Sequence, residues 1–160
     1  MDSDQLKFIL THNEYTKKHF QTVLPYDMLH HIKKPDKKYQ SHVINSSISK
    51  SPGVHWICIY GNINEYEIFD PLGFAPKKFY KDLYFKLKSF SKKVISRNHQ
   101  IQSFSSISCG MFCCIYLHLR GLDLSQEQIF NKFFKKTDIG YNESLVSNFL
   151  ISPSPDIMKA

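Results

Sequence analysis

The alternation of apolar and polar residues is clearest near the middle of the chain, where it predicts a β-hairpin. Residues 54–60 (Val-His-Trp-Ile-Cys-Ile-Tyr) are rich in β-branched and aromatic side chains. Residues 61–64 (Gly-Asn-Ile-Asn) are typical of a turn. Residues 65–70 alternate between polar and apolar side chains before Pro71 ends the run. We therefore expect two antiparallel strands over residues 54–60 and 65–70.

The register of this hairpin decides which side chains meet at its open end. If the turn is centred between Asn62 and Ile63, antiparallel pairing places His55 opposite Asp70. The two side chains then share one face of the hairpin. A slip of one residue would separate them, so the prediction depends on the register.

A second pattern predicts a buried helix. Residues 109–119 are apolar on nearly every side of a helical projection, and a helix of that kind belongs in the middle of a domain. A Ser-rich loop over residues 101–108 leads into it, and Arg120-Gly121 is a typical C-terminal stop. Cys109 would lie in the first turn of this helix.

The remaining elements complete an α+β domain. For residues 12–50 we expect short helical or loop segments, with one extended piece at 42–45. The other predicted elements are a helix over 4–11, an amphipathic helix over 77–93, a strand from 94–96 and 99–104, a helix from the Ser125 capping box through Phe134, and a helix capped by Asn142 through Leu150. Their order favours an α+β class, and a length of 160 residues favours a single domain over residues 1–160.

Composition limits the cellular setting. No apolar run approaches the length of about 18 residues that a transmembrane helix needs, and Met1-Asp2-Ser3-Asp4 does not begin a signal peptide. We expect an intracellular, non-membrane protein whose four cysteines stay reduced. The cysteines form no CxxC pair and His30-His31 has no second ligand pair nearby, so no metal site is expected.

The formal net charge of +7 is concentrated in one segment. Its basic residues are Lys77, Lys78, Lys81, Lys86, Lys88, Lys92, Lys93 and Arg97, against one acid, Asp82. Such a stripe is typical either of a solvated helix face or of a surface that contacts DNA or another polyanion. No sequence motif for reading RNA or DNA accompanies it.

Four residues have the chemistry of a cysteine acyl-transfer site. Cys109 at a helix N-terminus would be a stabilised thiolate and hence a nucleophile. His55 would be its base, and Asp70 would orient the imidazole. The side-chain amide of Gln102 and the Cys109 N–H would stabilise an oxyanion. The residues alone leave another interpretation open, in which Cys109 is core filler, His55 is structural and Asp70 caps a turn.

The same residues stand in motifs that resemble the adenovirus maturation endopeptidase (adenain) family. The motifs are Gly53-Val54-His55-Trp56, Ile68-Phe69-Asp70-Pro71-Leu72-Gly73-Phe74, and Gln102 with six residues before Cys109-Gly110-Met111-Phe112-Cys113-Cys114-Ile115-Tyr116-Leu117-His118. Similar proteases occur in Polinton-type virus-like transposons, and the order His, acid, Gln, Cys also fits the wider clan of SUMO-specific proteases. The resemblance implies a papain-like cysteine protease core, in which a central buried helix starting at the nucleophile packs on a small mixed or antiparallel β-sheet with flanking helices.

The resemblance also implies an activity. It assigns His55, Asp70, Gln102 and Cys109 to catalysis in a thiol endopeptidase that hydrolyses viral or virus-like capsid and core precursors at Gly-containing sites. The acid is Asp where the adenovirus enzyme has Glu. Two alternatives remain open: an isopeptidase that removes a ubiquitin-like modifier of the SUMO type, and a catalytically silent capsid- or DNA-binding module of the same fold.

Cofactors and setting follow from the same resemblance. The chemistry requires no cofactor, but the adenovirus enzyme is stimulated by DNA and by a disulfide-linked peptide. The resemblance therefore implies DNA or a peptide as an activator, but no cysteine lies between Cys58 and Cys109, so a disulfide tether for the peptide is not expected here. The resemblance places the protein in the host nucleus or the virion, and we expect a monomer.

Overall fold

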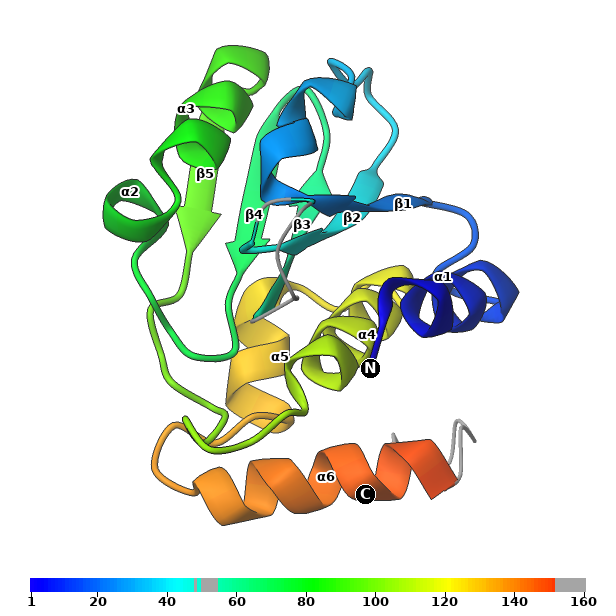
Figure 1. The fold of residues 1–160 in the computed structure, drawn as a ribbon, viewed down its shortest axis with the longest axis vertical. Coiled ribbons are helices and arrows are strands. Elements are labelled where there is room, and N and C mark those ends of the chain that lie inside the picture. Colours follow the sequence, from blue (N-terminus) through cyan, green and yellow to red (C-terminus); the bar gives the residue numbers. More distant parts are fainter. Residues whose placement is uncertain (48, 50–54, 152–160) are drawn as a thin grey trace.

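A five-stranded mixed β-sheet forms the centre of the computed structural model, which describes residues 1–47, 49 and 55–151 (Figure 1). The strands follow one another in chain order across the sheet. The central pairs β2–β3 and β3–β4 are antiparallel, whereas β1 and β5 add in parallel at the two edges. The strands are β1 (Phe20–Pro25), β2 (Gln40–Asn45), β3 (Trp56–Gly61), β4 (Glu65–Phe69) and β5 (Lys93–Ser96).

Helices cover both faces of the sheet, which confirms the predicted α+β class (Figure 1). On one face α4 packs against α1, α5 and α6, and on the other α3 and the 3₁₀ helix η1 bury a separate apolar cluster. The helices are α1 (Ser3–His12), η1 (Tyr26–His31), α2 (Pro76–Phe79), α3 (Lys81–Phe90), α4 (Cys109–Gly121), α5 (Gln126–Lys132) and α6 (Ile139–Ile151).

The predicted central helix is α4. Every residue of it except the half-buried Arg120 is buried, because the sheet, α1, α5 and α6 all contact it. The helix ends at Gly121, as predicted. A Cβ there would come within 2.4 Å of the Tyr15 carbonyl oxygen, so glycine allows the two backbones to approach closely. Because α4 is packed on several sides, it holds its first residue, Cys109, in a fixed place.

The predicted hairpin is β3–β4, but the predicted register was wrong by two residues. The turn is centred between Ile63 and Asn64, because the Asn62 side-chain oxygen accepts hydrogen bonds from the Asn64 and Glu65 N–H groups. Cys58 therefore pairs with Phe69, and continuation of the ladder puts Asp70 opposite residue 57. Because the shift is even, His55 and Asp70 still share a face, as diagonal neighbours.

The predicted amphipathic helix over 77–93 is broken at Tyr80. Its backbone leaves the helical region there (φ −131°, ψ 53°), which separates α2 from α3. Leu83 and Leu87 are buried as the periodicity predicts, but Phe79 is 52% exposed. The break turns the Tyr80 side chain toward the end of β4, where it contacts Asp70.

Other elements differ from the prediction in their limits. α1 and α5 begin at the capping boxes of Asp2 and Ser125, and β2 includes the extended piece predicted at 42–45. β1 was not predicted. Residues 99–104 form no strand.

Asn142 does not cap α6. It is buried inside the helix, where its side chain bonds backbone groups of Ile101 and Lys135. The predicted start of the hairpin strand at residue 54 and the Gly53-Val54 motif lie outside the described residues. None of the helices in the described part of the chain is long and apolar enough to cross a membrane.

Candidate active site

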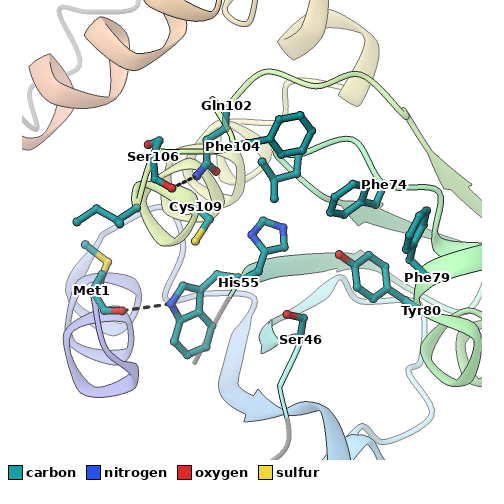
Figure 2. Close-up of a pocket in the computed structure, with 13 residues that line it drawn as sticks. Met1, Ser46, His55, Phe74, Phe79, Tyr80, Gln102, Phe104, Ser106 and Cys109 are labelled. Carbon is teal, nitrogen blue, oxygen red and sulfur yellow. Dashed lines mark hydrogen bonds between the residues drawn. The ribbon is translucent and has the colours of Figure 1, made fainter. Parts of the chain in front are cut away.

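Cys109 is the first residue of α4, and its side chain opens into a cleft between the helix and the end of the β3–β4 hairpin (Figure 2). Burial raises the pKa of the thiol. Hydrogen bonds from the His55 side chain and from the Trp56 and Gly110 backbones outweigh burial, and the net effect lowers the Cys109 pKa below its ordinary value of 9.0. The site therefore favours a thiolate.

His55 lies directly before β3 and connects Cys109 to Asp70. Its Nε2 is 2.7 Å from Asp70 Oδ1, which leaves Nδ1 for the sulfur. Burial lowers the imidazole pKa, but the hydrogen bonds to Asp70 and Cys109 and the charges of both groups raise it to about 9. The thiol and the imidazole are thus shifted in opposite directions, as in a thiolate–imidazolium pair.

Asp70 follows β4 and is almost completely buried, at 3% exposure. Besides His55, Oδ1 accepts the Leu72 N–H at 2.8 Å, and Oδ2 accepts the Tyr80 hydroxyl at 2.8 Å. Each carboxylate oxygen therefore has a donor, which satisfies the buried charge and fixes its orientation. Tyr80 was not singled out from the sequence, because its apolar neighbours at helical spacing make it look like part of a continuous helix.

Gln102 lies in the wall of the cleft beside Cys109 (Figure 2). Its side chain is buried, and Nε2 donates to the Ser106 carbonyl at 2.9 Å. That bond uses one of the two hydrogens of the amide. Within the described residues, Gln102 Oε1 is buried without a partner. The bond to Ser106 leaves one hydrogen of the Gln102 amide unused.

The loop that follows Asp70 is joined to the loop that contains Gln102. The Pro71 carbonyl accepts the N–H groups of Ile101 and Gln102 at 2.9 and 3.1 Å. Gly73 has φ +74°, and a Cβ there would lie 2.6 Å from Gln100 N. A side chain at position 73 would push these loops apart, so glycine keeps the acid and the amide in one unit.

The N-terminal half of α6 holds the same loop from the other side. Glu143 accepts the Ser103 N–H at 3.2 Å and the Ser106 hydroxyl at 3.1 Å. Asn142 Nδ2 donates to the Ile101 carbonyl at 3.1 Å. No local pattern in the sequence marks Glu143 or Asn142 for this role, since their partners lie about 40 residues earlier.

The cleft has a volume of about 680 Å³ and reaches well beyond the reacting groups. On one side Trp56 donates its indole N–H to the Met1 carbonyl at 3.2 Å. On the other side lie aromatic rings, among them Phe74 and Phe104 (Figure 2). The cleft therefore offers surface on both sides of Cys109 and His55.

The other residues considered from the sequence lie away from this cleft. Burial raises the pKa of the Cys113 and Cys114 thiols, as expected for inert core cysteines. His118 bonds Asn13, and His30 and His31 are exposed. Within the described ranges, no group of three or more His, Cys, Asp or Glu side chains could hold a metal ion.

The basic segment forms the outer surface of α2, α3 and β5. Several of its charges already have partners: Lys93 pairs with Glu65 at 3.4 Å, and Lys78, Lys86 and Arg97 lie over the rings of Phe79, Phe90 and Phe130. The contact of this segment with DNA or another polyanion stays a prediction. So do a peptide activator and the monomeric state.

Comparison with known proteins shows a match to one protein family. Residues 31–148 match the model of the Peptidase_C5 family, adenovirus endoprotease. A protein named Protease from Bovine adenovirus C serotype 10 is 28% identical over 89 residues, which are 48% of this chain and 45% of that protein. The Protease of Bovine adenovirus 7 is 33% identical over 94 residues, 51% of this chain and 46% of that protein.

The fold has a counterpart among solved structures. The crystal structure of the ASFV pS273R protease matches with a TM-score of 0.52 and 15% sequence identity, over 86% of this chain and 64% of that one. This likeness supports the fold alone. The chain spans about half the length of the curated relatives that it matches.

Proposed function

The chain belongs to the adenovirus endoprotease family, and on that premise we propose that it is a cysteine endopeptidase with Cys109 as nucleophile, His55 as base, Asp70 as orienting acid and Gln102 in the oxyanion hole. Its substrates would be structural precursor polypeptides of a virus or virus-like particle, cut at Gly-containing sites. One observation carries the proposal: His55, which is 2.7 Å from Asp70 Oδ1 through its Nε2, lines the same cleft as Cys109, and the pKa values of the thiol and the imidazole are shifted in opposite directions.

The first half of the reaction transfers the acyl group to sulfur. The Cys109 thiolate attacks the scissile carbonyl carbon, and the carbonyl oxygen becomes an oxyanion that accepts hydrogen bonds from the Gln102 amide and the Cys109 N–H. As the C–N bond breaks, the His55 imidazolium gives its proton to the departing amine. The products are a thioester on Cys109, a neutral imidazole and a free amine.

The second half returns the enzyme to its starting state. The neutral imidazole of His55 takes a proton from water, whose oxygen attacks the thioester carbon. The same donors stabilise the second oxyanion, and the C–S bond breaks to release the carboxylic acid and the thiolate. Asp70 keeps the imidazole in one orientation through both halves, because its own position is fixed by Leu72 and Tyr80.

Cleavage of defined peptides tests the proposal. Internally quenched peptides with a central Gly, and a ubiquitin-like fusion with a C-terminal Gly-Gly, would be offered to the full chain with and without DNA. We expect cleavage after Gly in a peptide, and no cleavage by Cys109→Ala. Cleavage of the fusion alone would favour the isopeptidase alternative. Equal cleavage by Cys109→Ala, or none by either protein under any condition, would overturn the proposal.

A further inference from the structure

Three aromatic rings form a continuous apolar surface beside the reacting groups. Phe74 follows β4, Phe79 ends α2, and Phe104 precedes α4. The ring centroids of Phe79 and Phe104 lie 4.8 and 6.2 Å from that of Phe74. Phe79 and Phe104 are 52% and 67% exposed, yet all three rings line the same cleft as Cys109. We call these three residues the aromatic shelf.

The shelf lies on a definite side of the proposed chemistry. In Figure 2, His55 stands between Cys109 and the shelf, and Met1 lies on the opposite side of the sulfur. Asp70 holds His55 Nε2, so Nδ1 is the nitrogen left to protonate the departing amine. The leaving half of the substrate must therefore begin next to His55 and continue toward the shelf.

The acyl half takes the other direction. The tetrahedral carbon is bonded to the Cys109 sulfur, its oxygen points to Gln102, and its nitrogen points to His55, so the remaining bond leads away from His55. That direction is the part of the cleft at Met1, whose carbonyl accepts the indole N–H of Trp56. The two halves of the substrate thus meet different surfaces, and only the leaving half meets the aromatic shelf.

On the basis of the function proposed above, we propose that the aromatic shelf binds a large apolar side chain, such as Leu, Met or Phe, from one of the first three residues after the scissile bond. The rings of Phe74, Phe79 and Phe104 offer carbon surface, so a small polar side chain would gain nothing there. Two segments bring these rings to one place next to the cleft, one with the half-buried Phe74 and the exposed Phe79 and the other with the exposed Phe104.

Cleavage rates of matched peptides test the proposal. All peptides share one acyl half that ends in Gly and differ only by Leu or Ser at the first, second or third position after it. At one of these positions we expect kcat/KM to be about 10-fold higher for Leu than for Ser, the scale of a hydrophobic subsite. In the double variant Phe79→Ala/Phe104→Ala the ratio should fall below about threefold. Phe85→Ala, which removes a ring that is 56% exposed but does not line the cleft, should keep the ratio.

The outcomes separate this proposal from the proposed function. A ratio near one at all three positions, or a ratio that survives in the double variant, would overturn the shelf and leave the protease intact. If no peptide is cleaved, the proposed function fails. A binding measurement then tests whether the aromatic shelf takes an apolar side chain. Fluorescein-labelled tripeptide amides with Leu or Ser would then be titrated into Cys109→Ala protein. Leu-selective binding that Phe79→Ala/Phe104→Ala abolishes would support the shelf, and equal binding would overturn it.

Discussion

The Tyr80 hydroxyl donates to Asp70 Oδ2 at 2.8 Å, while the other oxygen of the same carboxylate holds His55. The contact exists because the chain leaves helical geometry at Tyr80, between α2 and α3. The buried acid thus has a donor on each side. The hydroxyl acts on the imidazole through Asp70, which makes Tyr80 a positioning residue.

Replacement of Tyr80 by Phe removes that hydroxyl and leaves Asp70 Oδ2 buried without a donor. We expect the free energy of unfolding, measured by urea titration, to fall by about 1–3 kcal/mol. The alkylation rate of Cys109 at neutral pH should fall as well, because the orientation of His55 loosens. Tyr84→Phe is the matched control on α3. Equal effects of the two variants on alkylation would contradict this role for Tyr80.

Glu143 on α6 holds the loop that contains Gln102, through Ser103 and Ser106. In Glu143→Ala we expect kcat on a cleaved peptide to fall about 10-fold, since one misplaced oxyanion donor costs roughly 10²–10³ when lost completely. Glu143→Gln should recover part of that loss, because its amide oxygen still accepts one of the two bonds. Ser144→Ala, on the same helix, is the control. A Glu143→Ala enzyme with unchanged kcat would show that α6 does not position the loop.

The loop after Asp70 and the loop that contains Gln102 are in contact at Gly73. Because Gly73 has φ +74° and a Cβ would lie 2.6 Å from Gln100 N, Gly73→Ala should cost more than about 2 kcal/mol of unfolding free energy. In Gly140→Ala, on α6, the new Cβ would lie 3.7 Å from Asp138 Oδ1, which is an ordinary contact. We expect this variant to be neutral or to raise the unfolding free energy by up to about 1 kcal/mol. Thermal unfolding of the pair measures the contrast, and similar melting temperatures for the two variants would refute it.

Gln102 is proposed to act only on the oxyanion. Gln102→Ala should therefore lower kcat by roughly 10²–10³. The alkylation rate of Cys109 should stay near that of the wild type, because none of the groups that lower the Cys109 pKa belongs to Gln102. Peptide kinetics and iodoacetamide labelling of the same preparation separate these effects. A parallel loss of both rates would place Gln102 in the thiolate environment and not in the oxyanion hole.

Local patterns in the sequence were sufficient for the parts of the site that depend on single elements. The buried α4 with Cys109 at its start follows from an apolar run, and the hairpin with His55 and Asp70 follows from a β-rich run and a short alternation. The predicted register was wrong because the Asn62 side-chain oxygen accepts the Asn64 N–H and moves the turn. That bond depends on a rotamer, which a residue pattern does not specify.

Contacts between distant segments could not be predicted in the same way. Glu143 and Asn142 reach residues about 40 positions earlier, and Tyr80 reaches Asp70 only because a helix breaks. β1 was missed since its burial alternates irregularly along the strand. Each of these features depends on tertiary packing, which overrides the local preference of the sequence for helix or strand.

The pairing of Cys109 with His55 is the centre of the account, and the pH dependence of Cys109 alkylation tests it most directly. Iodoacetamide would be applied to the wild type and to His55→Ala between pH 4 and pH 10, with adducts mapped by mass spectrometry and the buried Cys113 and Cys114 as internal controls. His55, with a pKa of about 9, should stay protonated up to about pH 9 and stabilise the Cys109 thiolate. The thiolate should therefore be populated from the lowered thiol pKa upward. We expect a midpoint for Cys109 below 9 in the wild type, and a rise of that midpoint in His55→Ala. A wild-type midpoint at or above 9, or one that His55→Ala does not move, would contradict the account.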